Sequence, residues 1–140
     1  MSYPYQHIFV SLDGGPRQLE VLKKAAAFAH ANKAKLSLAH VVDVATQKLS
    51  EAELAEDVAD YEAALGPELE KLRADERIAE VNLYVKAGLI REVLTGLVDD
   101  LEPDLVVCGA RASARLNYAQ MGSISSYLVR NVAADVLVVK

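Results

Sequence analysis

The stretch on which the fold class depends is LVVCG, Leu105–Gly109, an apolar run that ends in a glycine. A second such run, IFVSL, lies near the start of the chain at residues 8–12. Continuous apolar runs of this length are typical of strands that are buried on both faces of a parallel sheet. We therefore place both runs at the centre of such a sheet.

Further strands and helices are predicted from the pattern on either side of these two runs. The expected strands are 36–42, 81–85 and 136–139, and the expected helices follow residue 16, begin after Ser50, and span 90–101 and about 123–131. Strands that alternate with helices indicate an α/β domain, in which helices cover both faces of a parallel sheet. We expect residues 1–140 to form one such domain.

The texture of the strands also predicts their order. Val81, Leu83 and Val85 alternate with polar residues, which indicates a strand near an edge of the sheet. With the two continuous runs at the centre, the order 3-2-1-4-5 follows. This order reverses between strands one and four, and open α/β sheets bind ligands there, beyond the carboxyl ends of the strands. The residues at those two ends are Asp13 and Gly109.

Two local features of the long second helix can be predicted as well. Ser50 is expected to cap the start of the helix, with Glu53 reaching back to complete a capping box. Pro67 lies inside the helical pattern and has no backbone donor, so we expect a kink or a break there.

The composition excludes several classes of function. The chain has 52% hydrophobic and 25% charged residues and a net charge of -5, which is ordinary for a globular protein. Its basic residues are scattered, which argues against nucleic acid or an anionic membrane as a partner. One cysteine forms no internal disulfide, no apolar run approaches the roughly 18 residues of a membrane span, and the start of the chain lacks a signal-peptide pattern. A cytoplasmic location is expected.

The candidate ligand-binding loop follows the fourth strand. It starts with Gly109–Ala112 and returns to a helix at Gly122-Ser123. Glycines let the backbone approach a ligand closely, and the first amides of a helix favour phosphate oxygens. Ser123 and Ser125 add hydroxyl groups, and Arg111 adds positive charge. The lysine-containing phosphate loop and the dinucleotide glycine fingerprint are both missing from the sequence, so a phosphate site here depends on backbone amides.

These residues resemble the signature of the universal stress protein family. That signature is Gly, two residues, Gly, nine residues, and then Gly followed by Ser or Thr. The spacing here is the same, with Gly109, Ala112 in place of the second glycine, and Gly122-Ser123. Asp13 after strand one and His40-Val41-Val42 at the end of strand two agree with the family as well. The resemblance covers essentially the whole chain.

The resemblance implies a Rossmann-like fold of the adenine nucleotide alpha hydrolase-like kind, in a dimeric cytoplasmic protein of the stress response. Many members bind ATP: the strand-one aspartate holds the ribose, the strand-two valine contacts adenine, and the glycine loop surrounds the phosphates. Carried over to this chain, the binding residues are Asp13, Val41, Gly109, Arg111, Ala112, Gly122, Ser123, Ile124 and Ser125. The implied cofactor is ATP or another adenine nucleotide, with Mg. No metal ligands and no catalytic residues are predicted in the protein itself.

Alternatives remain open at this point. Another branch of the family lacks the glycines and does not bind ATP, and Ala112 places this chain between the two branches. If position 112 needs a positive φ, alanine costs about 1 kcal/mol, which weakens binding without abolishing it. Asp13 also suits a plainer role as a turn or capping residue. The alternative functions are a stress protein that acts through dimerisation and protein partners, and a slow ATPase or self-phosphorylating protein.

The last strand predicts a partner. Residues 136–139 are uniformly apolar, yet the order 3-2-1-4-5 places them at an edge. A bare apolar edge recruits other chains, so we expect a second copy to cover it in a two-fold homodimer. The simpler alternative is a strand that is buried under the helices.

Overall fold

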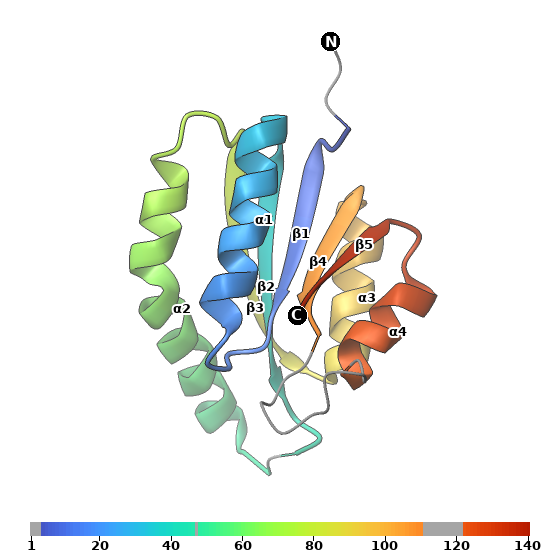
Figure 1. Cartoon of the computed structure of the whole chain (residues 1–140). Helices are drawn as coiled ribbons and strands as arrows, with labels where there is room; N and C mark the ends of the chain where they lie inside the picture. Colours follow the sequence, from blue (N-terminus) through green and yellow to red (C-terminus); the bar gives the residue numbers. More distant parts are fainter. Residues whose placement is uncertain (1–3, 47, 111–121) are drawn as a thin grey trace.

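Strands and helices alternate along the chain, as the sequence pattern predicts (Figure 1). The computed structural model of the protein describes residues 4–46, 48–110 and 122–140. Within these residues the elements are, in chain order, β1 (His7–Leu12), α1 (Gln18–Asn32), β2 (Lys35–Asp43), α2 (Glu51–Arg73), β3 (Glu80–Gly88), α3 (Ile90–Leu101), β4 (Leu105–Gly109), α4 (Ser123–Asn131) and β5 (Asp135–Val139).

In the described residues, five parallel strands form one sheet in the order β3-β2-β1-β4-β5. The predicted order is therefore confirmed. Ile8 of β1 pairs with Leu36 on one side and with Leu105 on the other. Because β1 and β4 lie inside the sheet, their apolar runs are buried on both faces, and Phe9 and Val107 are fully buried. The chain connections reverse direction here: β2 and β3 follow on one side of β1, and β4 and β5 lie on its other side.

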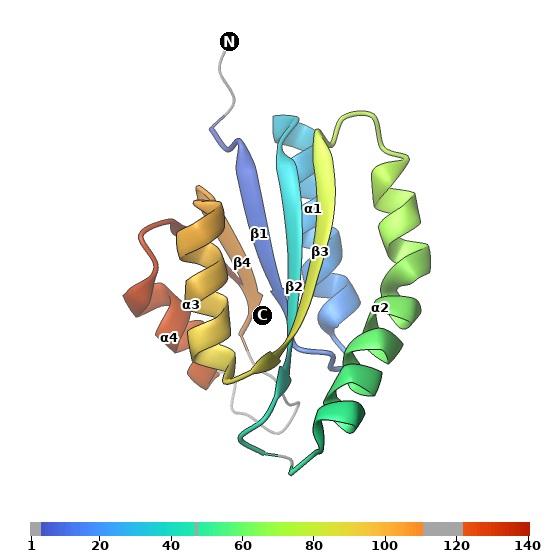
Figure 2. The ribbon, with the colours of Figure 1, turned by 180° about the vertical axis from the view of Figure 1, so that it is seen from behind.

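The helices cover both faces of the sheet (Figures 1 and 2). α1 and α2 lie on one face, and α3 and α4 lie on the other. Successive side chains of a strand point to opposite faces. Ile8 and Val10 accordingly pack in the core under α1 and α2, whereas Phe9 packs with Leu94 and Leu128 under α3 and α4. The sheet thus has two hydrophobic cores, one on each face of the described fold.

The long helix α2 confirms one local prediction and excludes one of the two outcomes of the other. Ser50 accepts a hydrogen bond from the Glu53 amide, and the Glu53 side chain accepts one from the Ser50 amide, each at 3.2 Å, which completes the capping box. Of the two outcomes predicted at Pro67, the break is wrong, because α2 continues through it without interruption, and the kink stays a prediction. Pro67 removes the hydrogen bond to the carbonyl of Ala63. Ala63 is exposed, so water replaces that bond at little cost.

β5 forms the edge of the sheet next to β4. Val136, Leu137, Val138 and Val139 are each partly exposed in the chain as described. No helix in the described part of the chain combines the length and the apolar character needed to cross a bilayer.

Candidate ligand-binding site

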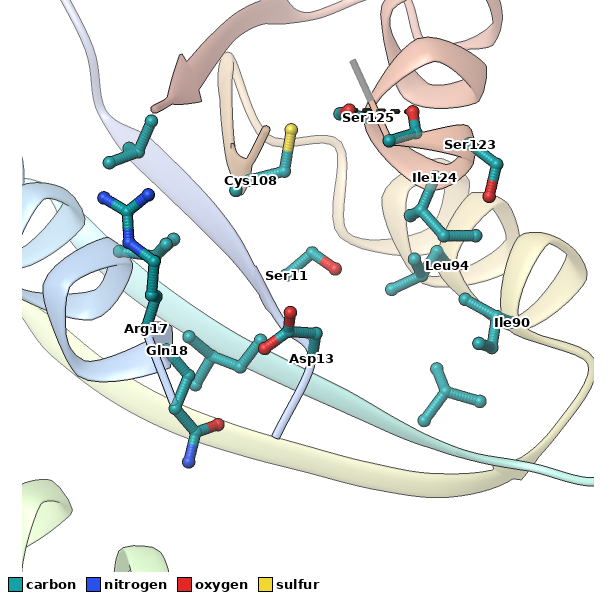
Figure 3. A pocket seen from close by; sticks show the side chains of 16 residues that line it. Ser11, Asp13, Arg17, Gln18, Ile90, Leu94, Cys108, Ser123, Ile124 and Ser125 are labelled. Carbon is teal, nitrogen blue, oxygen red and sulfur yellow. Dashed lines mark hydrogen bonds between the residues drawn. The ribbon is translucent and has the colours of Figure 1, made fainter. Parts of the chain in front are cut away.

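A cavity of about 250 Å³ opens at the carboxyl ends of β1 and β4 (Figure 3). Its walls come from β1, β2, β4 and the end of β5 and from the first turns of α1, α3 and α4. Parallel strands end at the same edge of a sheet, and the reversal of strand order leaves a crevice between β1 and β4. The fold therefore creates this cavity at the position that the strand order predicts.

Most of the predicted site residues lie around this cavity, although they come from four different parts of the chain. The predicted residues that line it are Asp13, Val41, Gly109, Gly122, Ser123, Ile124 and Ser125. Arg111 and Ala112 lie outside the described residues. Asp13 directly follows β1, Val41 lies on β2, Gly109 ends β4, and Gly122 to Ser125 start α4. The role of each residue in ligand binding stays a prediction.

The turn after β1 presents the carboxylate of Asp13. One carboxylate oxygen, Oδ1, accepts a hydrogen bond from the Gly15 amide at 2.7 Å. Gly14 has a φ of 76°, a conformation that glycine adopts without strain. A Cβ atom on Gly15 would lie 3.1 Å and 3.3 Å from the two oxygens of Asp13. The two glycines therefore shape a turn in which an exposed carboxylate has room on the cavity side.

The start of α4 supplies backbone donors. Gly122 is the N-cap residue of α4. Glycine has no side chain, so it does not cap the first amides of the helix. The Gly122 amide itself donates to the Ala110 carbonyl. Because the helix dipole places positive charge here, this end of α4 favours an anion such as phosphate.

The two serines of this turn have different roles. Ser123 is exposed, and its hydroxyl lies beside the cavity in Figure 3. Ser125 is 2% exposed, and its hydroxyl lies 2.9 Å from the Gly122 carbonyl and 3.2 Å from the Ala110 carbonyl. A hydroxyl has one proton to donate, and here it is shared between these two carbonyls. Ser125 therefore ties the end of β4 to the start of α4, and Ser123 is the hydroxyl that remains available to a ligand.

One wall of the cavity is apolar. Val41, Leu94 and Cys108 are 8%, 1% and 3% exposed, and Ile90 and Ile124 complete the wall as partly buried side chains. Burial raises the pKa of the Cys108 thiol to about 11, so it stays protonated and unreactive at neutral pH. An apolar lining with a few polar groups is the usual arrangement of a small-molecule site.

Sequence reasoning missed three polar residues that line the cavity: Ser11 of β1, and Arg17 and Gln18 at the start of α1. The Arg17 guanidinium pairs with Glu20 at 2.8 Å and donates to the Lys140 carbonyl at the end of β5. Arg17 and Gln18 could have been predicted from their position in the sequence, because they lie at the start of α1, the helix that follows the Asp13 turn. Among the described lining residues, Asp13 and Arg17 are the ones that carry charge.

The cavity brings together a carboxylate, an apolar wall and a helix N-terminus. The described residues contain no group of three or more His, Cys, Asp or Glu side chains that could hold a metal ion. The expectation of Mg therefore rests on the family resemblance.

A cavity at the reversal point of an open parallel sheet is the place where α/β proteins of this kind bind small molecules. The sequence profile described as "Universal stress protein family" matches residues 4–140 of this chain. The chain therefore belongs to the universal stress protein family.

Individual family members agree with this assignment. The chain is 27% identical over 139 residues to universal stress protein A of Photorhabdus laumondii, which covers 96% of this chain and 94% of that one. Its fold is similar to that of UspA from Lactobacillus plantarum, with a TM-score of 0.83, 21% identity and coverage of 97% and 98% of the two chains. A universal stress protein from Archaeoglobus fulgidus in complex with dAMP has a TM-score of 0.69, 17% identity and coverage of 97% and 98%. The two structures share the Rossmann-like fold of this chain.

Proposed function

We propose that this universal stress protein binds an adenine nucleotide in the cavity between β1 and β4. The observation that carries the proposal is the convergence of three features on one cavity: the Asp13 carboxylate, the apolar wall around Val41 and the uncapped start of α4. The complex of the Archaeoglobus protein with dAMP supports a mononucleotide as the class of ligand.

Each feature suits one part of the nucleotide. Asp13 accepts hydrogen bonds from ribose hydroxyls, because an ionised carboxylate is an acceptor only. Val41 and the apolar wall contact the base. The amides of Ser123 and Ile124 and the Ser123 hydroxyl bind phosphate oxygens. The volume of about 250 Å³ lies near the lower end of the range for ligand pockets, which suits a compact nucleotide. If ATP binds, Mg is expected to accompany it through its phosphate oxygens.

Thermal unfolding with AMP, dAMP and ATP, the last with and without Mg, tests this proposal. A ligand that binds the folded state at about 100 times its Kd stabilises it by about 2.7 kcal/mol, so the Tm rises measurably. Asp13→Ala is expected to weaken binding at least about tenfold, since the hydrogen bonds to a charged acceptor are lost. Asp100→Ala, which removes an exposed carboxylate on α3, is the matched control and leaves the shift unchanged. If no adenine nucleotide shifts the Tm at millimolar concentration, the proposal fails.

We further propose that the cavity serves binding rather than a dedicated reaction. General acid–base chemistry uses paired groups with pKa values near neutrality. Among the described residues that line the cavity, Asp13 is the one carboxylate and the Cys108 thiol stays protonated. Steady phosphate release from ATP that disappears in Asp13→Ala would contradict this and favour the slow ATPase.

We also propose a homodimer through residues 136–139. The support is the partly exposed, apolar β5 at the edge of the sheet, because exposed apolar edges pair with other chains. Val138→Lys is expected to give a folded monomer in sedimentation analysis, whereas Val129→Lys on α4, where valine is 48% exposed, leaves the dimer intact. A monomeric wild-type protein would contradict the proposal. A stable dimer that shows no response to nucleotide would favour the alternative role, action through dimerisation and protein partners.

A further inference from the structure

Three side chains from three elements meet behind the turn that carries Asp13. His40 comes from β2, Tyr61 from α2 and Gln18 from α1. The rings of His40 and Tyr61 stack, with centroids 3.8 Å apart and planes inclined by 11°. The Tyr61 hydroxyl donates to Oε1 of Gln18 at 2.7 Å. We call His40, Tyr61 and Gln18 the brace.

Both ends of the brace bind the backbone next to Asp13. Nδ1 of His40 lies 2.8 Å from the Leu12 carbonyl, which only accepts, so the proton of this hydrogen bond is on Nδ1. At the other end, Oε1 of Gln18 accepts from the Gly14 amide at 3.2 Å. The brace therefore holds the residue before Asp13 and the residue after it.

The turn also rests directly on the brace. A Cβ atom on Gly14 would lie 3.1 Å from Cε1 of His40, so the backbone at Gly14 sits against the imidazole edge. Burial and the negative charge of Asp13 both raise the pKa of Tyr61. The Tyr61 hydroxyl therefore keeps its proton and acts as a donor throughout the physiological range.

Simple packing of α2 on the sheet does not account for these contacts. Packing requires an aromatic ring at position 61, and phenylalanine provides one. The hydroxyl is instead placed on an acceptor that also binds the Gly14 amide. The Tyr61 hydroxyl therefore shares its acceptor with the backbone of the turn.

We propose that His40, Tyr61 and Gln18 are positioning residues that set the conformation of the Asp13 turn and thereby connect α2 to nucleotide affinity. The effect on affinity rests on the proposed function. α2 is suited to transmit such an effect, because Leu65 is the one buried residue along its described length and most of the helix faces solvent. A change in the position of α2 moves Tyr61. Tyr61 is connected to the turn through Gln18, which binds both the Tyr61 hydroxyl and the Gly14 amide.

The first test needs no ligand. Tyr61→Phe keeps the stacked ring and removes the hydroxyl. We expect the amide NMR signals of Gly14 and Gly15 to shift, and their hydrogen exchange to become about two- to tenfold faster, which corresponds to one lost hydrogen bond. Tyr84→Phe, at a partly buried tyrosine of β3 that packs in the other core, is the control and leaves both amides unchanged. If Gly14 and Gly15 respond alike in the two variants, the proposal is overturned whether or not nucleotide binds.

The second test is a double-mutant cycle with AMP, measured by calorimetry on wild type, Tyr61→Phe, Asp13→Ala and the double variant. Tyr61→Phe is expected to weaken AMP binding about two- to tenfold when Asp13 is present and to have no effect in the Asp13→Ala background. Equal weakening in both backgrounds means a general structural effect and overturns the positioning role. If wild type binds no AMP, the proposed function and the link to affinity both fail, and the amide signals still decide whether the brace sets the turn.

Discussion

Polar groups at the two ends of the sheet differ in their surroundings. At the amino ends of the strands, Asp104 accepts hydrogen bonds from the amides of Gln6 and His7 at 2.8 Å and 3.0 Å, and Nε2 of His7 lies 2.7 Å from the Ser37 hydroxyl. At the carboxyl ends, Asp13 and the start of α4 face a cavity. At the amino ends these polar groups bind each other, whereas at the carboxyl ends Asp13 keeps an exposed carboxylate and Ser123 an exposed hydroxyl beside the cavity.

This difference separates stability from function. Polar groups that pair within the protein contribute to folding, because breaking one pair leaves its partner unsatisfied. Polar groups that face a cavity contribute little to folding and are free to bind. Substitutions at the amino ends should therefore change the free energy of unfolding, and substitutions at the carboxyl ends should change the affinity for nucleotide.

The largest effect is expected at Asp104. Asp104→Ala removes two charge-assisted hydrogen bonds, so the free energy of unfolding should fall by about 2 kcal/mol in urea denaturation. Nucleotide affinity of the folded variant should stay within about twofold of wild type, because Asp104 lies at the far end of the sheet. The control Asp100→Ala should cost less than about 0.5 kcal/mol. If Asp104→Ala lost nucleotide affinity and kept its free energy of unfolding, the proposed difference between the two ends of the sheet would be wrong.

The next effect is expected at Gly15, on the cavity side. Gly15→Ala places a methyl group 3.1 Å from Oδ1 of Asp13, so the carboxylate must shift by a few tenths of an ångström. We expect AMP to bind about three- to tenfold more weakly, with a change in unfolding free energy below about 0.5 kcal/mol. Gly96→Ala in α3 is the matched control, since a Cβ there meets nothing within 4 Å. It should leave affinity unchanged and add up to about 1 kcal/mol of stability. Unchanged AMP affinity in Gly15→Ala would show that the carboxylate is not held as described.

The smallest effect concerns pH. Burial lowers the pKa of His7, the charge of Lys35 lowers it further, and the hydrogen bond to the Leu101 carbonyl and the nearby carboxylates only partly offset this. The unfolded chain, with an ordinary pKa of about 6.5, therefore binds a proton at higher pH than the folded protein does. Stability is complete above about pH 6.5 and falls as the pH drops toward the folded pKa of His7. The urea midpoint of His7→Gln should change less than that of wild type between about pH 7.5 and about pH 5.5. Equal changes of the urea midpoint in wild type and His7→Gln would show that His7 is not the source of the pH dependence.

Much of the fold follows from local sequence patterns. The continuous run at Leu105–Gly109 predicts a central strand, and the alternation around Leu83 predicts an edge strand, because a strand's neighbours in the sheet determine which of its faces are buried. The position of Asp13 at the cavity follows from the same reasoning. A break at Pro67, one of the two outcomes predicted there, does not occur, and the local rule does not take into account that Ala63, which loses its hydrogen bond, is exposed.

The details of the site are less predictable. Arg17 and Gln18 face the cavity because of the way α1 is rotated on the sheet. The Ser125 hydroxyl was expected to face a ligand, but its use depends on the distance to Ala110, which belongs to another element. The contact between His40 and Tyr61 joins β2 to α2. None of these features leaves a periodic pattern in the chain.

The sequence by itself thus determined the succession of elements, the order of the strands and the edge of the sheet at which the cavity opens. These depend on periodicity and on the turn residues, which are properties of neighbouring amino acids. Only the tertiary structure decided which polar groups satisfy each other and which remain open, as with Ser125 and Ser123. The physical reason is that a hydrogen bond or an aromatic stack depends on a few tenths of an ångström between residues far apart in the chain, and the packing of helices on the sheet sets that distance.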